Sequence, residues 1–154
     1  MQVGIKKLHE NEWLVHVGCA KIKMDRFSVE LLNITLEHVT MLESGQSHSN
    51  YKSYIKLGLQ LGDLDGRSLQ KALSAMDSVD VLHLLLAAKN PEFTEKVLHN
   101  MGGILAKQLQ SDLQSTPEPD EEVARKSIQV IVEKMFAMEA DGQIEFIKEN
   151  TKYI

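Results

Sequence analysis

Residues 77–91 of the chain read DSVDVLHLLLAAKNP, and this stretch decides the fold class. Asp77 is a good helix N-cap, and an acid follows at the third helical position, as in a capping box. The eight residues that come next, 81–88, are apolar almost all round a helical projection, which is typical of a buried helix. Asn90 and Pro91 then suit the cap and first position of a new helix. We therefore predict a central, buried helix over residues 78–89.

Further short helices surround this central helix along the sequence. Each shows apolar residues near the 3.6-residue period and ends at a polar turn with glycine or proline. The other predicted helices span residues 25–42, 50–61, 67–76, 91–101, 104–115 and 121–140. A short strand over 143–147 is predicted to close the domain. The expected fold is mainly α, a compact stack of short helices that forms a small superhelix.

The first 24 residues predict β structure instead. Apolar side chains alternate with others at Trp13, Val15, Val17 and Cys19, which is the period of a strand. Residues 3–8 can supply a partner strand, so a β-hairpin is expected. The predicted organisation is a β-hairpin over 1–24, a two-helix segment over 25–62, a helical domain over 63–147 and a tail over 148–154.

A two-stranded hairpin is marginally stable by itself, so we expect it to pack on the helices or to pair with a second chain. Trp13, Val15 and Val17 are the candidate contact residues for such an interaction. In one hypothesis, two hairpins pair edge to edge across a two-fold axis and form a homodimer. The mild positive charge of residues 1–28 could steer an acidic partner, but we favour the simpler interpretation, a solvated hairpin surface.

Composition and motifs argue against several function classes. The net charge of −5 does not suit a general nucleic-acid binder, and the single cysteine excludes an internal disulfide and a four-cysteine zinc site. Neither a phosphate-binding loop, a dinucleotide fingerprint nor a nucleophile elbow occurs, and no two histidines are four residues apart. We predict no catalytic residue, no cofactor and no metal, and hence no enzyme.

The longest apolar run, residues 84–88, is too short to cross a membrane, and no signal peptide opens the chain. We therefore predict no membrane insertion. A cytoplasmic location is expected, and a lone cysteine fits a reducing compartment.

Several residues allow a functional and a structural interpretation, and we favour the structural one for each. Cys19 could be a nucleophile beside a histidine and an acid, or a small apolar side chain. His83 could bind a metal or occupy the core with a hydrogen-bond partner. The acids of residues 118–122 could contact a basic partner or complement a helix dipole. Four methionines could form an adaptable surface or fill the core: Met76, Met101, Met135 and Met138.

A succession of segments in the second half carries a family likeness. These are residues 65–71, 76–78, 81–88, 95–101, 112–113, 128–132 and 141–144. In order and spacing, residues 65–147 resemble the C-terminal domain of the bacterial flagellar motor switch protein FliG. The resemblance implies an armadillo-like stack of helices whose work is contact with other proteins.

In that family, charged side chains around one helix contact the stator. Here the aligned positions hold Ala87, Ile104, Ser111 and Thr116, and only the acid at Asp112 is kept. An interface built on ion pairs would be crippled by these changes. The resemblance therefore implies a FliG-like accessory, regulator or assembly factor, with rotor, stator or export components as partners. Asp112 is the candidate contact residue, with a solvated surface acid as the alternative.

Two other functions stay open beside this one. The chain could be a generic dimeric helical adaptor or regulator unrelated to motility. It could also be an enzyme that uses Cys19 or a histidine, which would need a concave pocket with converging titratable groups.

Overall fold

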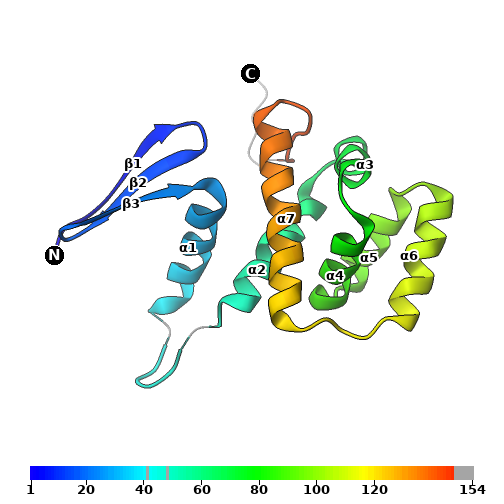
Figure 1. The fold of residues 1–154 in the computed structure, drawn as a ribbon, viewed down its shortest axis with the longest axis horizontal. Helices are drawn as coiled ribbons and strands as arrows, with labels where there is room; N and C mark the ends of the chain where they lie inside the picture. The colour runs from blue at the N-terminus through cyan, green and yellow to red at the C-terminus, as the bar shows by residue number, and fades with distance from the viewer. Residues whose placement is uncertain (41, 48, 148–154) are drawn as a thin grey trace. The chain divides into compact units, whose positions relative to one another are not determined.

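The structure is a computed structural model, and it describes residues 1–40, 42–47 and 49–147 (Figure 1). Three strands come first in the described chain: β1 (Val3–His9), β2 (Glu12–Val17) and β3 (Ala20–Asp25). Helices follow: α1 (Arg26–Val39), α2 (Asn50–Leu59), the 3-10 helix η1 (Gln60–Asp63), α3 (Gly66–Ala75), α4 (Ser78–Ala88), α5 (Pro91–His99), α6 (Gly103–Ser115) and α7 (Glu121–Ala140). The mainly α fold with β structure at the N-terminus is thus confirmed.

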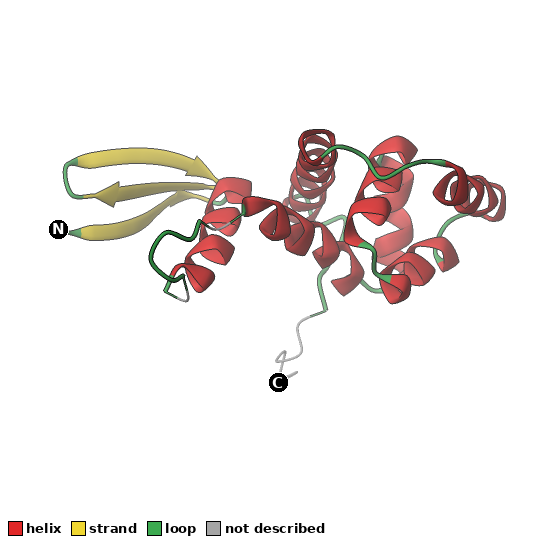
Figure 2. Cartoon of the chain, turned by 90° about the horizontal axis from the view of Figure 1, so that it is seen from below, coloured by secondary structure: helices red, strands yellow, loops and turns green. Residues whose placement is uncertain are grey.

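The chain divides into two compact units, which we call unit 1 (Met1–Ser53) and unit 2 (Tyr54–Ile154). The division lies within α2, whereas the sequence predicts a boundary near residue 62. Figure 2 shows the strands at the N-terminal end of the chain and helices through the remainder.

Unit 1 contains an antiparallel sheet in the order β1-β2-β3. The predicted hairpin is present as β1 and β2, and β3 adds a third strand that the sequence patterns do not predict. Val17 pairs with Ala20, so Gly18 and Cys19 form a two-residue turn. Gly18 has a φ of 60°, the conformation that glycine adopts readily at the first position of such turns. Cys19 therefore lies in an exposed turn, and its prediction as a strand residue is wrong.

Helix α1 follows β3 directly and packs against β2 and β3. Asp25 caps it, since its Oδ1 accepts a hydrogen bond of 2.8 Å from the backbone N–H of Ser28, as the sequence predicts. Phe27 and Ile34 are the buried side chains of the helix. Leu36 belongs to the predicted apolar stripe but is 54% exposed. Fewer residues of the stripe are therefore buried than the sequence pattern predicts.

Unit 2 is organised around α4 and α7, which lie side by side (Figure 1). The fully or nearly fully buried apolar side chains of the two helices are Val81, Leu82, Leu84, Leu85, Ala87, Ala124, Ile128, Ile131, Val132, Met135, Phe136 and Met138. The prediction of α4 as the central buried helix is confirmed, although Val79 in its first turn is 54% exposed. Met135 and Met138 fill the core, whereas Met76 and Met101 are only half-buried.

Side-chain caps start three of the helices of unit 2. Asp65 Oδ1 accepts from the N–H of Ser68 (2.7 Å), Asp77 Oδ1 from that of Val79 (2.9 Å), and Asn90 Oδ1 from that of Phe93 (3.1 Å). The hydrogen bond from the Ser68 backbone lowers the pKa of Asp65 below its ordinary value. The Asp65 carboxylate is therefore charged at neutral pH, as a strong cap requires.

Beyond α7 the chain returns to η1 without forming a strand. Gly142 has a φ of 72°, and the segment after it contributes one isolated bridge, between Leu64 and Phe146. The N–H of Ile147 donates to the carbonyl of Asp63 (3.0 Å), and Ile144 is 2% exposed. The predicted closing strand over 143–147 is wrong, because this segment faces a 3-10 turn instead of a strand edge.

No helix among the described residues is long and apolar enough to cross a membrane. The predicted tail, residues 148–154, lies outside the part of the chain that the structure describes.

Candidate protein-interaction surfaces

Helix α6 carries Asp112, the acid predicted as a contact residue. The Asp112 side chain is half-buried, and its Oδ1 accepts a hydrogen bond of 3.0 Å from Nε2 of Gln108, one turn earlier. A carboxylate that already bonds within its own helix is a weaker partner for an incoming cation. Lys107 is the only other charged residue on α6, so the helix offers few ionic contacts.

The first turn of α6 instead exposes two apolar side chains, Ile104 (87% exposed) and Leu105 (57%). They follow Gly102 and Gly103, around whose missing Cβ atoms no heavy atom lies within 4 Å. An adjacent pair of large apolar side chains in open surroundings is unusual on a soluble protein surface and is typical of contact sites. We call this pair the α6 apolar pair.

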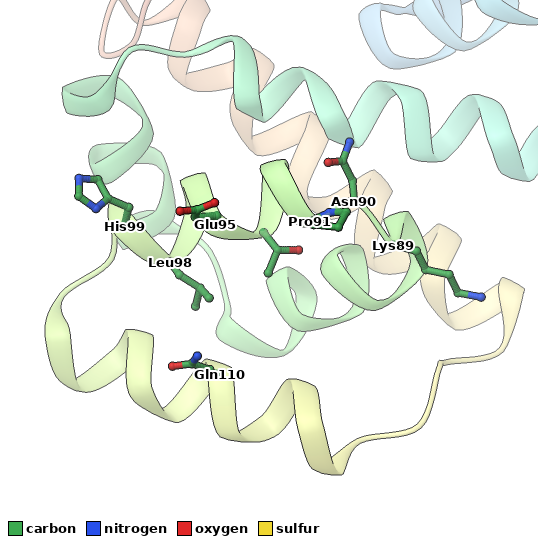
Figure 3. A pocket seen from close by; sticks show the side chains of 8 residues that line it. Lys89, Asn90, Pro91, Glu95, Leu98, His99 and Gln110 are labelled. Atoms are coloured by element: carbon green, nitrogen blue, oxygen red, sulfur yellow. The ribbon is translucent and has the colours of Figure 1, made fainter.

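A wide groove of about 760 Å³ lies between α5 and α6. It is lined by Lys89, Asn90, Pro91, Thr94, Glu95, Leu98, His99 and Gln110. Leu98 of α5 and Gln110 of α6 point toward one another across it, as Figure 3 shows. The lining mixes apolar side chains with three titratable ones of different kinds, Lys89, Glu95 and His99.

Lys89 stands at one end of this groove in a left-handed conformation, with φ 48° and ψ 39°. It is the only residue other than glycine with a positive φ in the described part of the chain. Its Nζ lies 2.7 Å from Oε2 of Glu118, one of the acids of residues 118–122. Because both side chains are largely exposed, this ion pair adds little to stability.

Two more acids of this run, Glu121 and Glu122, pair with Arg125 and Lys126, which lie one turn later in α7. They lie in the first turn of the helix, where acids complement the dipole. These contacts favour the structural interpretation of the acidic run.

The three contact candidates of the N-terminal sheet share one face but differ in exposure. Val15 is 5% exposed and Val17 39%, and Trp13 is half-buried. Nζ of Lys7 lies 5.5 Å from the centre of the Trp13 ring, a cation–π distance. Only Val17 of the three thus presents much apolar surface.

His83 is half-buried between α4 and α7, and its Nδ1 lies 2.8 Å from Oγ of the buried Ser127. It therefore has a side-chain partner on the neighbouring helix. Among the described residues, no group of three or more histidine, cysteine, aspartate or glutamate side chains is placed to hold a metal ion.

Comparison with known proteins places this architecture in a family. The sequence model described as the FliG C-terminal domain matches residues 59–146, which is more than half of the chain. The chain belongs to the FliG C-terminal domain family. No curated protein and no solved structure matches it significantly. The resemblance inferred from the sequence is thus confirmed, and the matched range spans η1 and helices α3 to α7 of unit 2.

The positions that the resemblance aligned with charged residues of the family differ in exposure. Ala87 is 6% exposed and belongs to the core, so it cannot contact a partner. Ser111 and Ile104 lie on the surface of α6, and Thr116 is half-buried at its end. The sequence patterns did not single out Leu105, whose 57% exposure is visible only in the structure.

Proposed function

We propose that the protein is a non-enzymatic protein–protein interaction module of the bacterial flagellar apparatus, acting in the cytoplasm. Its role is that of a FliG-like accessory, regulator or assembly factor, and its partners are rotor, stator or export components. The observation that carries this proposal is the family match over the helical part of unit 2. Domains of this family are parts of a motor, and they function by contact with other proteins.

A role other than standard torque generation is supported by the chemistry of α6. A torque-transmitting contact made of ion pairs needs fixed charges at the surface. Helix α6 has two charged residues, Lys107 and Asp112, and the second bonds to its own helix. The surface offers Ile104 and Leu105 in their place. A partner of this helix is held by apolar burial, which is less sensitive to salt than ion pairing.

The α6 apolar pair gives a direct test in a pull-down from a lysate of motile cells. Ile104→Glu should reduce the recovery of flagellar partners about tenfold or more, because it puts a charge where apolar surface is buried on binding. Val79→Glu is the matched control, since Val79 is a 54% exposed aliphatic residue on α4. Asp112→Asn should change recovery by less than about threefold.

Two results would count against the proposal. Recovery of no rotor, stator or export component by the unaltered protein would remove the flagellar role. Equal loss with Ile104→Glu and Val79→Glu would remove α6 as the contact surface while leaving the role itself standing.

The alternative, a dimeric helical adaptor unrelated to motility, is favoured by one observation, the exposed apolar residues on the N-terminal sheet. Dimer formation does not separate the two functions, because a flagellar protein can also form dimers. The partners recovered in the pull-down do separate them, and so does the presence or absence of flagellar or chemotaxis genes beside the gene.

A further inference from the structure

The strand register of unit 1 gathers lysines on one face of the sheet. Lys6 pairs with Leu14, and Leu14 pairs in turn with Lys23, so these three side chains form one row across the strands. In the next row on the same face, His16 pairs with Lys21. We call Lys6, Leu14, His16, Lys21 and Lys23 the basic face.

Helix α1 packs on the other side of the sheet and leaves the basic face open. The helix contacts β2 and β3, and Val15, which points away from the basic face, is only 5% exposed. A side chain of the central strand is buried to this extent only where another element packs over it. By contrast, Lys6 and Lys21 are exposed, and the Lys23 side chain is 72% exposed. The basic face is therefore accessible to a partner.

The centre of the basic face is low and flat because Gly4 has no side chain. A Cβ added to Gly4 would lie 2.5 Å from Cε1 of His16 and 2.8 Å from Nε2, so the imidazole ring lies directly over this glycine. Glycine in a strand often marks such a close approach. Beside the ring lies Leu14, which is half-buried. The ring and the leucine thus form a centre that the three longer lysine side chains surround.

The positive charge of this face is only partly balanced by the sheet itself. Both acids at the end of the face have partners: Glu12 pairs with Lys23 at 3.3 Å, and Asp25 caps α1. The register places no acid directly opposite Lys6 or Lys21. Lys21 and Lys23 are also on the same side of β3, about 7 Å apart, so their charges repel one another. An anion bound at this face would relieve that repulsion.

The make-up of the basic face favours an acidic protein segment over the other large anions. Sheets that bind single-stranded nucleic acid present several aromatic side chains to the bases, whereas the one ring on this face is that of His16. Basic clusters that bind anionic membranes usually contain at least four lysines or arginines, and this face has three. Residues 29–154 carry 12 basic and 19 acidic side chains, a net charge of −7, which opposes an extended polyanion. A short acidic segment makes only local contacts, within about one Debye length of the lysines.

We propose that the basic face binds an acidic segment of a partner protein, with carboxylates on both sides of an apolar side chain. Lys6 and Lys21 lie on the two outer strands, two strand spacings or about 10 Å apart. An extended segment presents every second side chain to one side, so Glu-x-Leu-x-Glu spans this width. Its carboxylates pair with the two lysines, and its leucine lies on Leu14 and the His16 ring. This inference does not rest on the flagellar role.

Fluorescence anisotropy on the full chain tests the proposal. The probe is a labelled peptide of ten residues that repeats Glu-Ser-Leu-Ser-Glu twice. At about 50 mM salt it should bind with a dissociation constant of about 100 µM or lower, and about 500 mM salt should weaken it tenfold or more, because the contact is ionic. The same peptide with glutamine in place of glutamate should not bind. Absence of binding by the acidic peptide, or equal binding of both peptides, would overturn the proposal.

Charge variants locate the contact on the sheet. Lys6→Gln and Lys21→Gln should each weaken the acidic peptide about twofold to fivefold, which is the range of single exposed ion pairs, and about tenfold together. The matched control combines Lys7→Gln, on the same strand but the opposite face, with Lys134→Gln on α7. It removes the same net charge and should weaken binding less than about twofold. Equal losses for the two double variants would indicate a response to net charge alone and would contradict the proposal.

Two further probes separate the acidic segment from the other anions. These are a single-stranded oligothymidine of ten nucleotides and a lipid vesicle that contains phosphatidylserine. Under the same low-salt conditions, the unaltered protein should bind both more weakly than it binds the acidic peptide. Tighter binding of the oligonucleotide or of the vesicle would assign the basic face to nucleic acid or membrane and would refute the assignment to a protein segment.

Discussion

Leu84→Ala is expected to lower the free energy of unfolding by about 2–5 kcal/mol. Leu84 is fully buried on α4, the helix that packs most extensively against α7. The backbone of α2 also approaches it closely: a Cβ added at Gly58 would lie 2.6 Å from Cδ1 of Leu84 and 3.4 Å from Cγ2 of Ile128. Three helices meet at this leucine, so its truncation leaves a cavity that cannot close easily. Urea unfolding followed by circular dichroism gives the value.

Val79→Ala is the control on the same helix. Val79 is 54% exposed in the first turn of α4, and its truncation removes little buried surface. The expected change is within about 0.5 kcal/mol. Similar losses for the two variants would show that α4 is not the centre of the core.

The helices of unit 2 could be predicted from the sequence because their starts have local chemical causes. Asp77 and Asn90 accept the hydrogen bonds that cap α4 and α5, and Pro91 fits the first helical position. Such signals depend on a few neighbouring residues, so one sequence contains all the information needed. The predicted helix 78–89 differs from α4 by a single residue at its end.

Strand pairing was harder to predict than the helices, because it depends on residues outside the local stretch of sequence. Strand β3 has Lys21, Lys23 and Asp25 among its six residues, and this polarity hides the alternation of Ile22 and Met24. At the other end, Ile144 and Phe146 alternate like a strand, but only one bridge forms, since the chain opposite them is a turn. Strand formation requires a neighbouring strand, and local patterns cannot supply one.

The exposure of the candidate contact positions could not be predicted from the sequence. The resemblance implied that Ala87 and Ile104 both stand where the family has charged residues, yet one is 6% and the other 87% exposed. Likewise Val15 and Val17 share a strand face, and only the second is open. Burial depends on what packs above a residue, which is a property of the assembled fold.

Lys96→Met should cost about 2–3 kcal/mol, because hydrogen bonds from a charged donor to partly buried acceptors are among the stronger ones. Lys96 on α5 is half-buried, and its Nζ donates to the carbonyls of Gly62 and Leu64, the second at 3.0 Å. Methionine preserves the apolar stem but leaves both carbonyls without this partner. Thermal and urea unfolding of the variant measure the loss. Lys126→Met is the control, since Lys126 is 78% exposed and pairs only with Glu122 on its own helix; it should cost no more than about 0.5 kcal/mol.

Lys96 holds the segment of residues 62–64 at the start of the family-matched domain, and the contacts of this segment with the end of the domain give a second readout. The segment that Lys96 holds also accepts the N–H of Ile147 at Asp63 and forms the Leu64–Phe146 bridge. Lys96→Met should loosen this segment. Hydrogen exchange at the Ile147 amide should therefore become faster, while the amides in the middle of α4 stay protected. If the Ile147 amide exchanges at the same rate in Lys96→Met and in the unaltered protein, Lys96 does not support the closing contact of the domain. That contact would then depend on the burial of Ile144 and on the hydrogen bonds of residues 143–147 with Asp63, Ser68 and Lys71.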